Sequence, residues 1–102
     1  MNKKKLSEIK KQLSSLRKSP CNINSKILVN IAKKLGRLKE NHGKEPYYER
    51  KNIPPRLNGS LSIPHRDELK PGTARNIIDF LINDVDEWEL FLIENESDEK
   101  NQ

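Results

Sequence analysis

The sequence predicts an α+β domain in which a helix is followed by three short antiparallel strands and a second helix. Apolar residues recur at helical spacing over residues 27–35 and again over 74–82, and the segment between them loses that period. Glycines and paired prolines interrupt this middle segment, as is typical of short strands joined by turns. We expect a three-stranded antiparallel sheet with helices on one face, an N-terminal helical extension and a C-terminal helix.

Residues 2–18 are predicted to form a basic amphipathic helix. Its apolar residues fall at helical steps among lysines, at Leu6, Ile9, Leu13 and Leu16. Three roles are open to it: packing on the domain, gripping nucleic-acid phosphates, or contacting a partner. Pro20 lies in a linker that follows. We therefore divide the chain into a basic helix with its linker at 1–22, a domain at 23–93 and an acidic, disordered tail at 94–102.

The first helix of the domain has signals at both ends. Asn24 or Ser25 can cap its start, and Gly36 supplies a left-handed stop. Beyond it we predict two strands joined by a turn at residues 41–43, where glycine tolerates a positive φ. The third strand is expected at 60–63, because apolar and polar residues alternate there and a proline, which has no N–H, ends the run.

The last long helix is predicted to begin at a Lys-Pro-Gly-Thr sequence that starts at Lys70. The proline ring presets φ, and the hydroxyl of Thr73 can cap the helix. A helix start leaves backbone N–H groups free, here beside Lys70 and Arg75, which together form a potential phosphate site. A small break is predicted near Asn83, and the C-terminal helix beyond it carries Trp88 as a packing anchor.

Charge is distributed unevenly along the 102 residues. Residues 1–51 carry 15 Lys and Arg against 4 Asp and Glu, whereas residues 52–102 carry 5 against 11. A basic half favours polyanionic partners, although ordinary lysine-rich solubility is the alternative reading. No long apolar run is present, so we expect no membrane partner.

Cys21 is the only cysteine, which rules out an internal disulfide and a cysteine-based zinc site and indicates a reducing, cytoplasmic environment. No apolar stretch of the kind found in a signal peptide follows the basic start. The carboxylates show no metal-ligand spacing, and no phosphate loop or nucleophile motif is present. We expect neither a metal nor a small-molecule cofactor.

Residues 63–78 resemble the C-terminal half of HicA toxins, the small mRNA-cleaving toxins of bacterial type II toxin–antitoxin pairs. The shared pattern is a strand ending in proline, a histidine shortly after, Leu-Lys-Pro-Gly-Thr and an apolar helix. Here it reads Ile63-Pro64-His65 and then Glu68-Leu69-Lys70-Pro71-Gly72-Thr73-Ala74-Arg75-Asn76-Ile77-Ile78. The resemblance implies the α-β-β-β-α arrangement of double-stranded RNA-binding domains, which recognise RNA by shape and phosphate. It also implies an endoribonuclease acting on mRNA, with a cognate HicB-like antitoxin as protein partner.

Cleaving RNA without a metal requires a general base, a general acid and a cation for the phosphate. Histidine suits both proton roles, and His42 and His65 lie at predicted strand ends. The catalytic histidine of HicA toxins lies two residues after a glycine, and Glu45 occupies that position after Gly43 here. Three accounts stay open: Glu45 is the base with a raised pKa, His42 replaces the histidine, or the protein binds RNA without cleaving it.

A set of cationic, aromatic and hydroxyl side chains is predicted to contact RNA. Adjacent strand residues face opposite ways, so of Tyr47 and Tyr48 at most one stacks on a base. The predicted RNA-binding residues are Lys44, Tyr48, Arg50, Arg66, Lys70, Thr73 and Arg75.

Three hypotheses of function follow from the sequence. The first is a HicA-like toxin, a metal-independent endoribonuclease acting on mRNA. The second is a non-catalytic RNA-binding module of the same fold. The third is a protein-interaction subunit without a nucleic-acid partner, built from a basic N-terminal and an acidic C-terminal helix.

Overall fold

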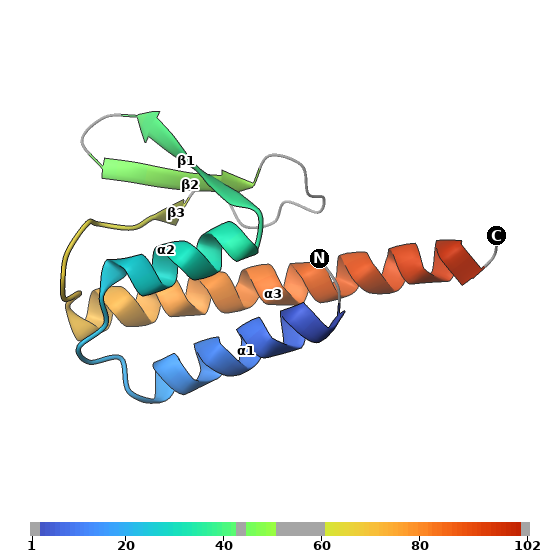
Figure 1. Ribbon diagram of the computed structural model, residues 1–102, viewed down its shortest axis with the longest axis horizontal. Coiled ribbons are helices and arrows are strands. Elements are labelled where there is room, and N and C mark those ends of the chain that lie inside the picture. The colour runs from blue at the N-terminus through green and yellow to red at the C-terminus, as the bar shows by residue number, and fades with distance from the viewer. Residues whose placement is uncertain (1–2, 43–44, 51–60, 101–102) are drawn as a thin grey trace.

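The computed structural model describes residues 3–42, 45–50 and 61–100, and for residues 40–42, 45–47, 49–50 and 95–100 the backbone alone (Figure 1). Three helices and three strands follow in the order α1 (Lys3–Lys18), α2 (Ser25–Lys34), β1 (Arg37–His42), β2 (Glu45–Arg50), β3 (Leu61–Ser62) and α3 (Pro71–Lys100). The strands pair antiparallel in the order β1-β2-β3. β1 and β2 therefore form a hairpin. The turn predicted at residues 41–43 overlaps the end of β1, and Gly43 lies outside the described residues.

The predicted α+β class, with its double-stranded RNA-binding-domain arrangement, is wrong, because the protein is mainly helical. The helices hold 16, 10 and 30 residues, whereas the strands hold 6, 6 and only 2. In Figure 1, α3 runs through the middle of the molecule, α1 lies along one side of it, and α2 and the small sheet lie on the other. The predicted N-terminal extension is thus part of the helical layer, because its apolar stripe has a partner in α3.

α3 is the element on which the others pack. Its buried residues recur every three or four positions, as one face of a continuous helix requires: Ala74, Ile77, Ile78, Leu81, Val85 and Trp88. The predicted break near Asn83 is absent, because this stripe keeps its phase across that residue. α3 continues to Lys100, through the residues from 94 onward for which the sequence predicts disorder. Within the described part of the chain, no helix is both long enough and apolar enough to cross a membrane.

α1 packs antiparallel along α3, so the first of its three possible roles is confirmed. Leu6, Ile9 and Leu13 are buried in the shared core. At the margins of this contact, Lys10 Nζ lies 3.0 Å from Glu89 Oε1, and Arg17 Nε lies 2.6 Å from Asp79 Oδ1. The hydrogen bond to Glu89 raises the pKa of the Lys10 ammonium. Because exposed ion pairs contribute little, the apolar stripe supplies most of the stability of this contact.

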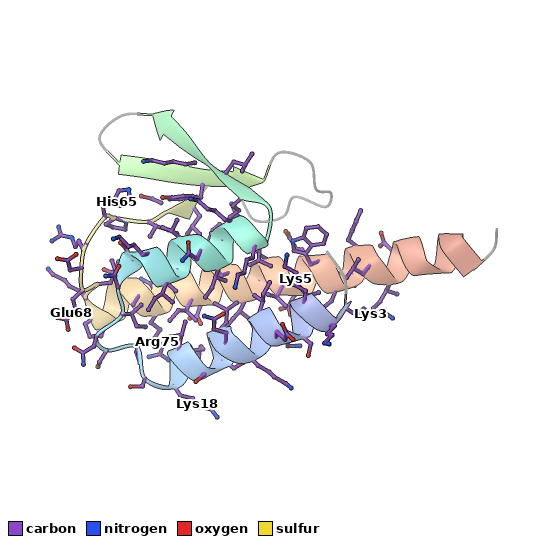
Figure 2. All side chains as sticks on the ribbon, viewed as in Figure 1. Lys3, Lys5, Lys18, His65, Glu68 and Arg75 are labelled. Atoms are coloured by element: carbon purple, nitrogen blue, oxygen red, sulfur yellow. The ribbon has the colours of Figure 1, made fainter. Side chains whose placement is uncertain are left out.

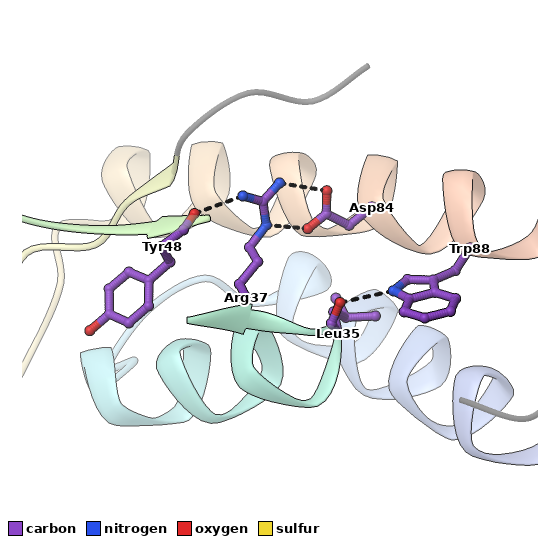
Figure 3. Close-up of polar contacts among 5 residues, drawn as sticks. All are labelled: Leu35, Arg37, Tyr48, Asp84 and Trp88. Atoms are coloured by element: carbon purple, nitrogen blue, oxygen red, sulfur yellow. Dashed lines mark hydrogen bonds and ion pairs between the residues drawn. The ribbon is translucent and has the colours of Figure 1, made fainter. Parts of the chain in front are cut away.

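The ends of α2 agree with the sequence prediction. The side chain of Asn24 accepts a hydrogen bond of 2.8 Å from the N–H of Lys26, which caps the start of the helix. Gly36 ends the helix with a φ of 90°, a conformation that favours glycine. The carbonyl of Leu35, left without a helical donor, accepts a 2.9 Å hydrogen bond from the indole N–H of Trp88. Trp88 is a packing anchor, as predicted, and it ties the end of α2 to α3 (Figure 3).

A buried ion pair joins β1 to α3 (Figure 3). The side chains of Arg37 and Asp84 are fully buried. The guanidinium donates to the carboxylate twice, through Nε to Oδ2 and through Nη2 to Oδ1 at 2.8 Å. Nη1 donates at 2.7 Å to the backbone carbonyl of Tyr48 in β2, and the ring of Phe80 lies 4.9 Å from Cζ. Such bidentate pairing fits the planar fork of arginine and satisfies both charges inside the core.

Removing one partner of this pair is expected to destabilise the protein more than removing both. Arg37→Met or Asp84→Leu alone leaves an uncompensated buried charge and should lower the free energy of unfolding by about 3–5 kcal/mol. The double variant should lose less than either single variant, although the carbonyl of Tyr48 still loses a donor. Urea denaturation of the four proteins measures the coupling. Additive losses would show that the two side chains do not act as a pair.

Candidate nucleic-acid interface

The N-termini of α2 and α3 lie at the same end of the molecule (Figure 1). Ile23, just before α2, forms an antiparallel bridge with Leu69, just before α3, and the N–H of Leu69 donates to the carbonyl of Ile23 at 2.8 Å. The N–H of Ser25 donates to the carbonyl of Arg66 at 3.1 Å, and the N–H of Arg66 donates back to Ser25 Oγ at 3.2 Å. These contacts hold residues 66–69 against the start of α2.

The start of α3 leaves backbone donors facing outward. The carbonyl of Lys70 accepts from the N–H of Ala74 at 2.9 Å, so Lys70 precedes the first turn and Pro71 is its first residue. Thr73 lies inside that turn, and its predicted role as the cap is wrong because the helix begins earlier. Proline has no N–H, so the first donors without a helical acceptor belong to Gly72 and Thr73.

The space in front of this helix start is open, and the first turn of the helix carries no negative charge. Gly72 is exposed, and a Cβ atom built on it would meet nothing within 4 Å. Neither α2 nor α3 has an acidic residue in its first turn. The partial positive charge of each helix start is therefore not neutralised by its own helix, a condition that favours an anion.

Exposed cations surround the two helix starts. We call this set the helix-start corner, and its side chains are Lys26, His65, Arg66, Lys70 and Arg75, all of them exposed. Two carboxylates, Asp67 and Glu68, are exposed in the same loop, so its charge is mixed on that side. Figure 2 shows Arg75 on the side of α3 that faces the C-terminal end of α1, away from His65. The cations thus lie on both sides of the start of α3.

The candidate catalytic residues gather at one end of the sheet. His42 and Glu45 are register partners across the hairpin. β3 runs antiparallel to β2 with Ser62 opposite Tyr47, so the chain leaving β3 heads towards the start of β2 and then reaches His65. The backbone therefore brings the three candidates towards the same end. The side chains of His42, Glu45 and Arg50, and all of Lys44, lie outside the described residues.

Tyr48, predicted to stack on a base, is a core residue, and that prediction is wrong. Only 1% of Tyr48 is exposed, and it lies opposite Leu61 of β3. The alternation of strand residues is as expected, but position 48 faces inward because the sheet packs on α2 and α3 through that face. Burial raises the pKa of the Tyr48 phenol above its ordinary value.

The sequence analysis missed two residues of this interface, Ser25 and Lys26. Both belong to α2, and they reach the corner only because Ile23 and Leu69 pair across a long sequence separation. In the sequence, the indication of this pairing is that an apolar residue, Ile23 or Leu69, lies two residues before each helix and has polar neighbours. That pattern permits a bridge without specifying its partner.

Other parts of the described chain offer less chemistry. No group of three or more His, Cys, Asp or Glu side chains among the described residues could hold a metal ion. A cavity of about 320 Å³ lies between the N-terminal half of α1 and the C-terminal half of α3, lined in part by Leu6, Leu92 and Ile93. It is at the opposite end of α3 from the helix-start corner. No protein-family model matches this chain, and neither a curated protein nor a solved structure is detectably similar to it.

Replacing Tyr48 by phenylalanine is expected to reduce the loss of stability at alkaline pH. The unfolded phenol ionises near pH 10, whereas the buried phenol keeps its proton to higher pH. The unfolded state then binds fewer protons, so stability falls as pH rises above about 10, by at most about 1.4 kcal/mol per pH unit for this group. Urea midpoints of wild type and Tyr48→Phe between pH 8.5 and 11 measure the difference. Parallel curves would contradict the burial of this phenol.

Proposed function

We propose that this protein is an RNA-binding, HicA-like toxin that cleaves mRNA in the cytoplasm without a metal. The observation that carries the proposal is the helix-start corner, where exposed His65 and four exposed Lys and Arg side chains adjoin two helix starts that have no acidic residue in their first turns. The resemblance of residues 63–78 to HicA toxins supplies mRNA as the substrate and a HicB-like antitoxin as the partner. Both agree with an interface built for phosphate rather than for base edges.

The chemistry requires groups that this end of the molecule can supply. A general base removes the proton from a 2′-hydroxyl, whose oxygen attacks the adjacent phosphorus and expels the 5′-oxygen, which takes a proton from a general acid. His65 can serve as the general base or as the general acid, and His42 or Glu45 can serve in the role that His65 does not take. The N–H groups of Gly72 and Thr73, with Lys70, suit the negative charge that develops on the phosphate oxygens.

A second candidate function is RNA binding without cleavage. The observation in its favour is that Glu45 occupies the position where the resemblance expects a catalytic histidine. The same corner would then hold RNA as a ligand, since phosphate binding there does not depend on any group at position 45. The two candidates share an interface and differ only in the reaction.

Purified protein is expected to cleave labelled RNA in EDTA. His65→Ala should lower the rate by about 10²–10⁴, the usual contribution of a general acid or base, and His42→Ala and Glu45→Ala identify its counterpart. Lys34→Ala, at the far end of α2, serves as the control. Intact RNA that is nevertheless bound, more weakly as salt rises, would leave only the second candidate. An absence of salt-dependent binding would refute both.

Gly72→Asp is expected to weaken RNA binding without destabilising the fold. A carboxylate in the first turn stabilises a helix by about 0.3–1 kcal/mol but neutralises its anion site. We expect about a tenfold loss of affinity with an unchanged or higher melting temperature. Gly72→Ala is the matched control, because its Cβ meets nothing within 4 Å and adds no charge. Equal affinities of the two variants would place RNA elsewhere.

A further inference from the structure

The outward face of α1 is strongly cationic. The helix contains seven cations, Lys3, Lys4, Lys5, Lys10, Lys11, Arg17 and Lys18, against the single carboxylate of Glu8. A hollow of about 480 Å³ runs along its solvent side, and its lining consists only of lysines and serines: Ser7, Lys10, Lys11, Ser14, Ser15 and Lys18. All six are exposed; Ser7 and Lys10 lie at the margin of the contact with α3, and the other four lie further from it. One face of α1 therefore builds the core while the other stays free for a ligand.

The spacing on this face suits a phosphodiester chain. Lys4, Lys11 and Lys18 recur every seven residues, so they lie on one side of the helix with an axial rise of about 10 Å between neighbours. The hydroxyls of Ser7 and Ser14 add donors between them. Lysines and hydroxyl groups in a row are the donors that contact nucleic-acid phosphates, and they read no sequence. Lys10 is already paired with Glu89, so we do not count it among these contacts.

This face is continuous with the helix-start corner. α1 ends beside the first half of α3, where Arg17 pairs with Asp79. Figure 2 shows Arg75 between the start of α3 and the end of α1 that carries Lys18. A chain leaving the corner past Arg75 therefore reaches Lys18 first and then Lys11.

We propose that α1 is a second RNA-binding surface, along which a single strand held at the helix-start corner continues. The inference rests on the proposed function of that corner and adds the direction and extent of the bound RNA. α1 then lengthens the footprint beyond the few nucleotides that the corner holds. The occupant is RNA because Lys4, Lys11 and Lys18, with serine hydroxyls between them, outnumber the single exposed carboxylate of Glu8, an excess of positive charge that suits a phosphodiester chain.

The test compares a 5-nucleotide with a 20-nucleotide RNA by fluorescence anisotropy. Lys11→Gln/Lys18→Gln should bind the long RNA about tenfold more weakly, with a salt dependence reduced by about 1.4 in the log–log slope, the value for two lost contacts to a single strand. Its affinity for the short RNA should be unchanged. Lys33→Gln/Lys34→Gln removes the same charge from the far end of α2 and should change neither affinity. Circular dichroism confirms that the variants fold.

The outcomes separate this inference from the proposed function. If the α1 double variant behaves like the α2 control while Gly72→Asp weakens both RNAs, the corner binds RNA and α1 does not, which overturns the inference. If the α1 variant weakens the long RNA while Gly72→Asp weakens neither, α1 is an RNA surface and the corner is wrongly assigned. If wild type binds neither RNA, the proposed function and this inference are both wrong.

Discussion

The ion pair between Arg37 and Asp84 constrains the whole arrangement. A guanidinium and a carboxylate can both be fully buried only if each satisfies the other, so β1 has to cross α3 at this turn. Nη1 of Arg37 donates to the carbonyl of Tyr48, which adds β2 to the same contact. One turn further along α3, the indole N–H of Trp88 donates a hydrogen bond to the carbonyl of Leu35, at the end of α2. Directional bonds thus set the position of the sheet, where apolar packing alone would allow it to slide.

This constraint acts at a distance from the candidate interface yet decides its shape. The hairpin is held at its open end by Arg37, and its other end, at His42 and Glu45, lies towards the end of the molecule where α2 begins. Independently, the bridge between Ile23 and Leu69 holds the two helix starts together. Two separate attachments to α3 therefore bring the hairpin and the helix starts to one end of the molecule. Either attachment alone would leave the hairpin and the two helix starts without a fixed relation.

Features set by neighbouring residues were predictable from the sequence, and features set by distant partners were not. The caps at Asn24 and Gly36 depend on a few adjacent residues. The basic residues after β3 belong to one contiguous run, so His65, Arg66 and Lys70 could be grouped in advance. By contrast, Asp84 lies 47 residues from Arg37, and an acidic residue inside a helix is usually solvated. The packing of α1 and the burial of Tyr48 likewise depend on α3.

The basic first half and the acidic second half of the chain lie side by side in the folded protein. The acidic second half does not form a separate region, because Asp79 and Glu89 of α3 pair with the flanks of α1. These pairs neutralise the cations nearest α3 and leave those on the outward face. Together with the helix starts, that face makes one side of the molecule attractive to polyanions, whereas the acidic C-terminal half of α3 repels them. This charge distribution would steer the proposed RNA ligand towards α1 and the helix-start corner before any specific contact forms.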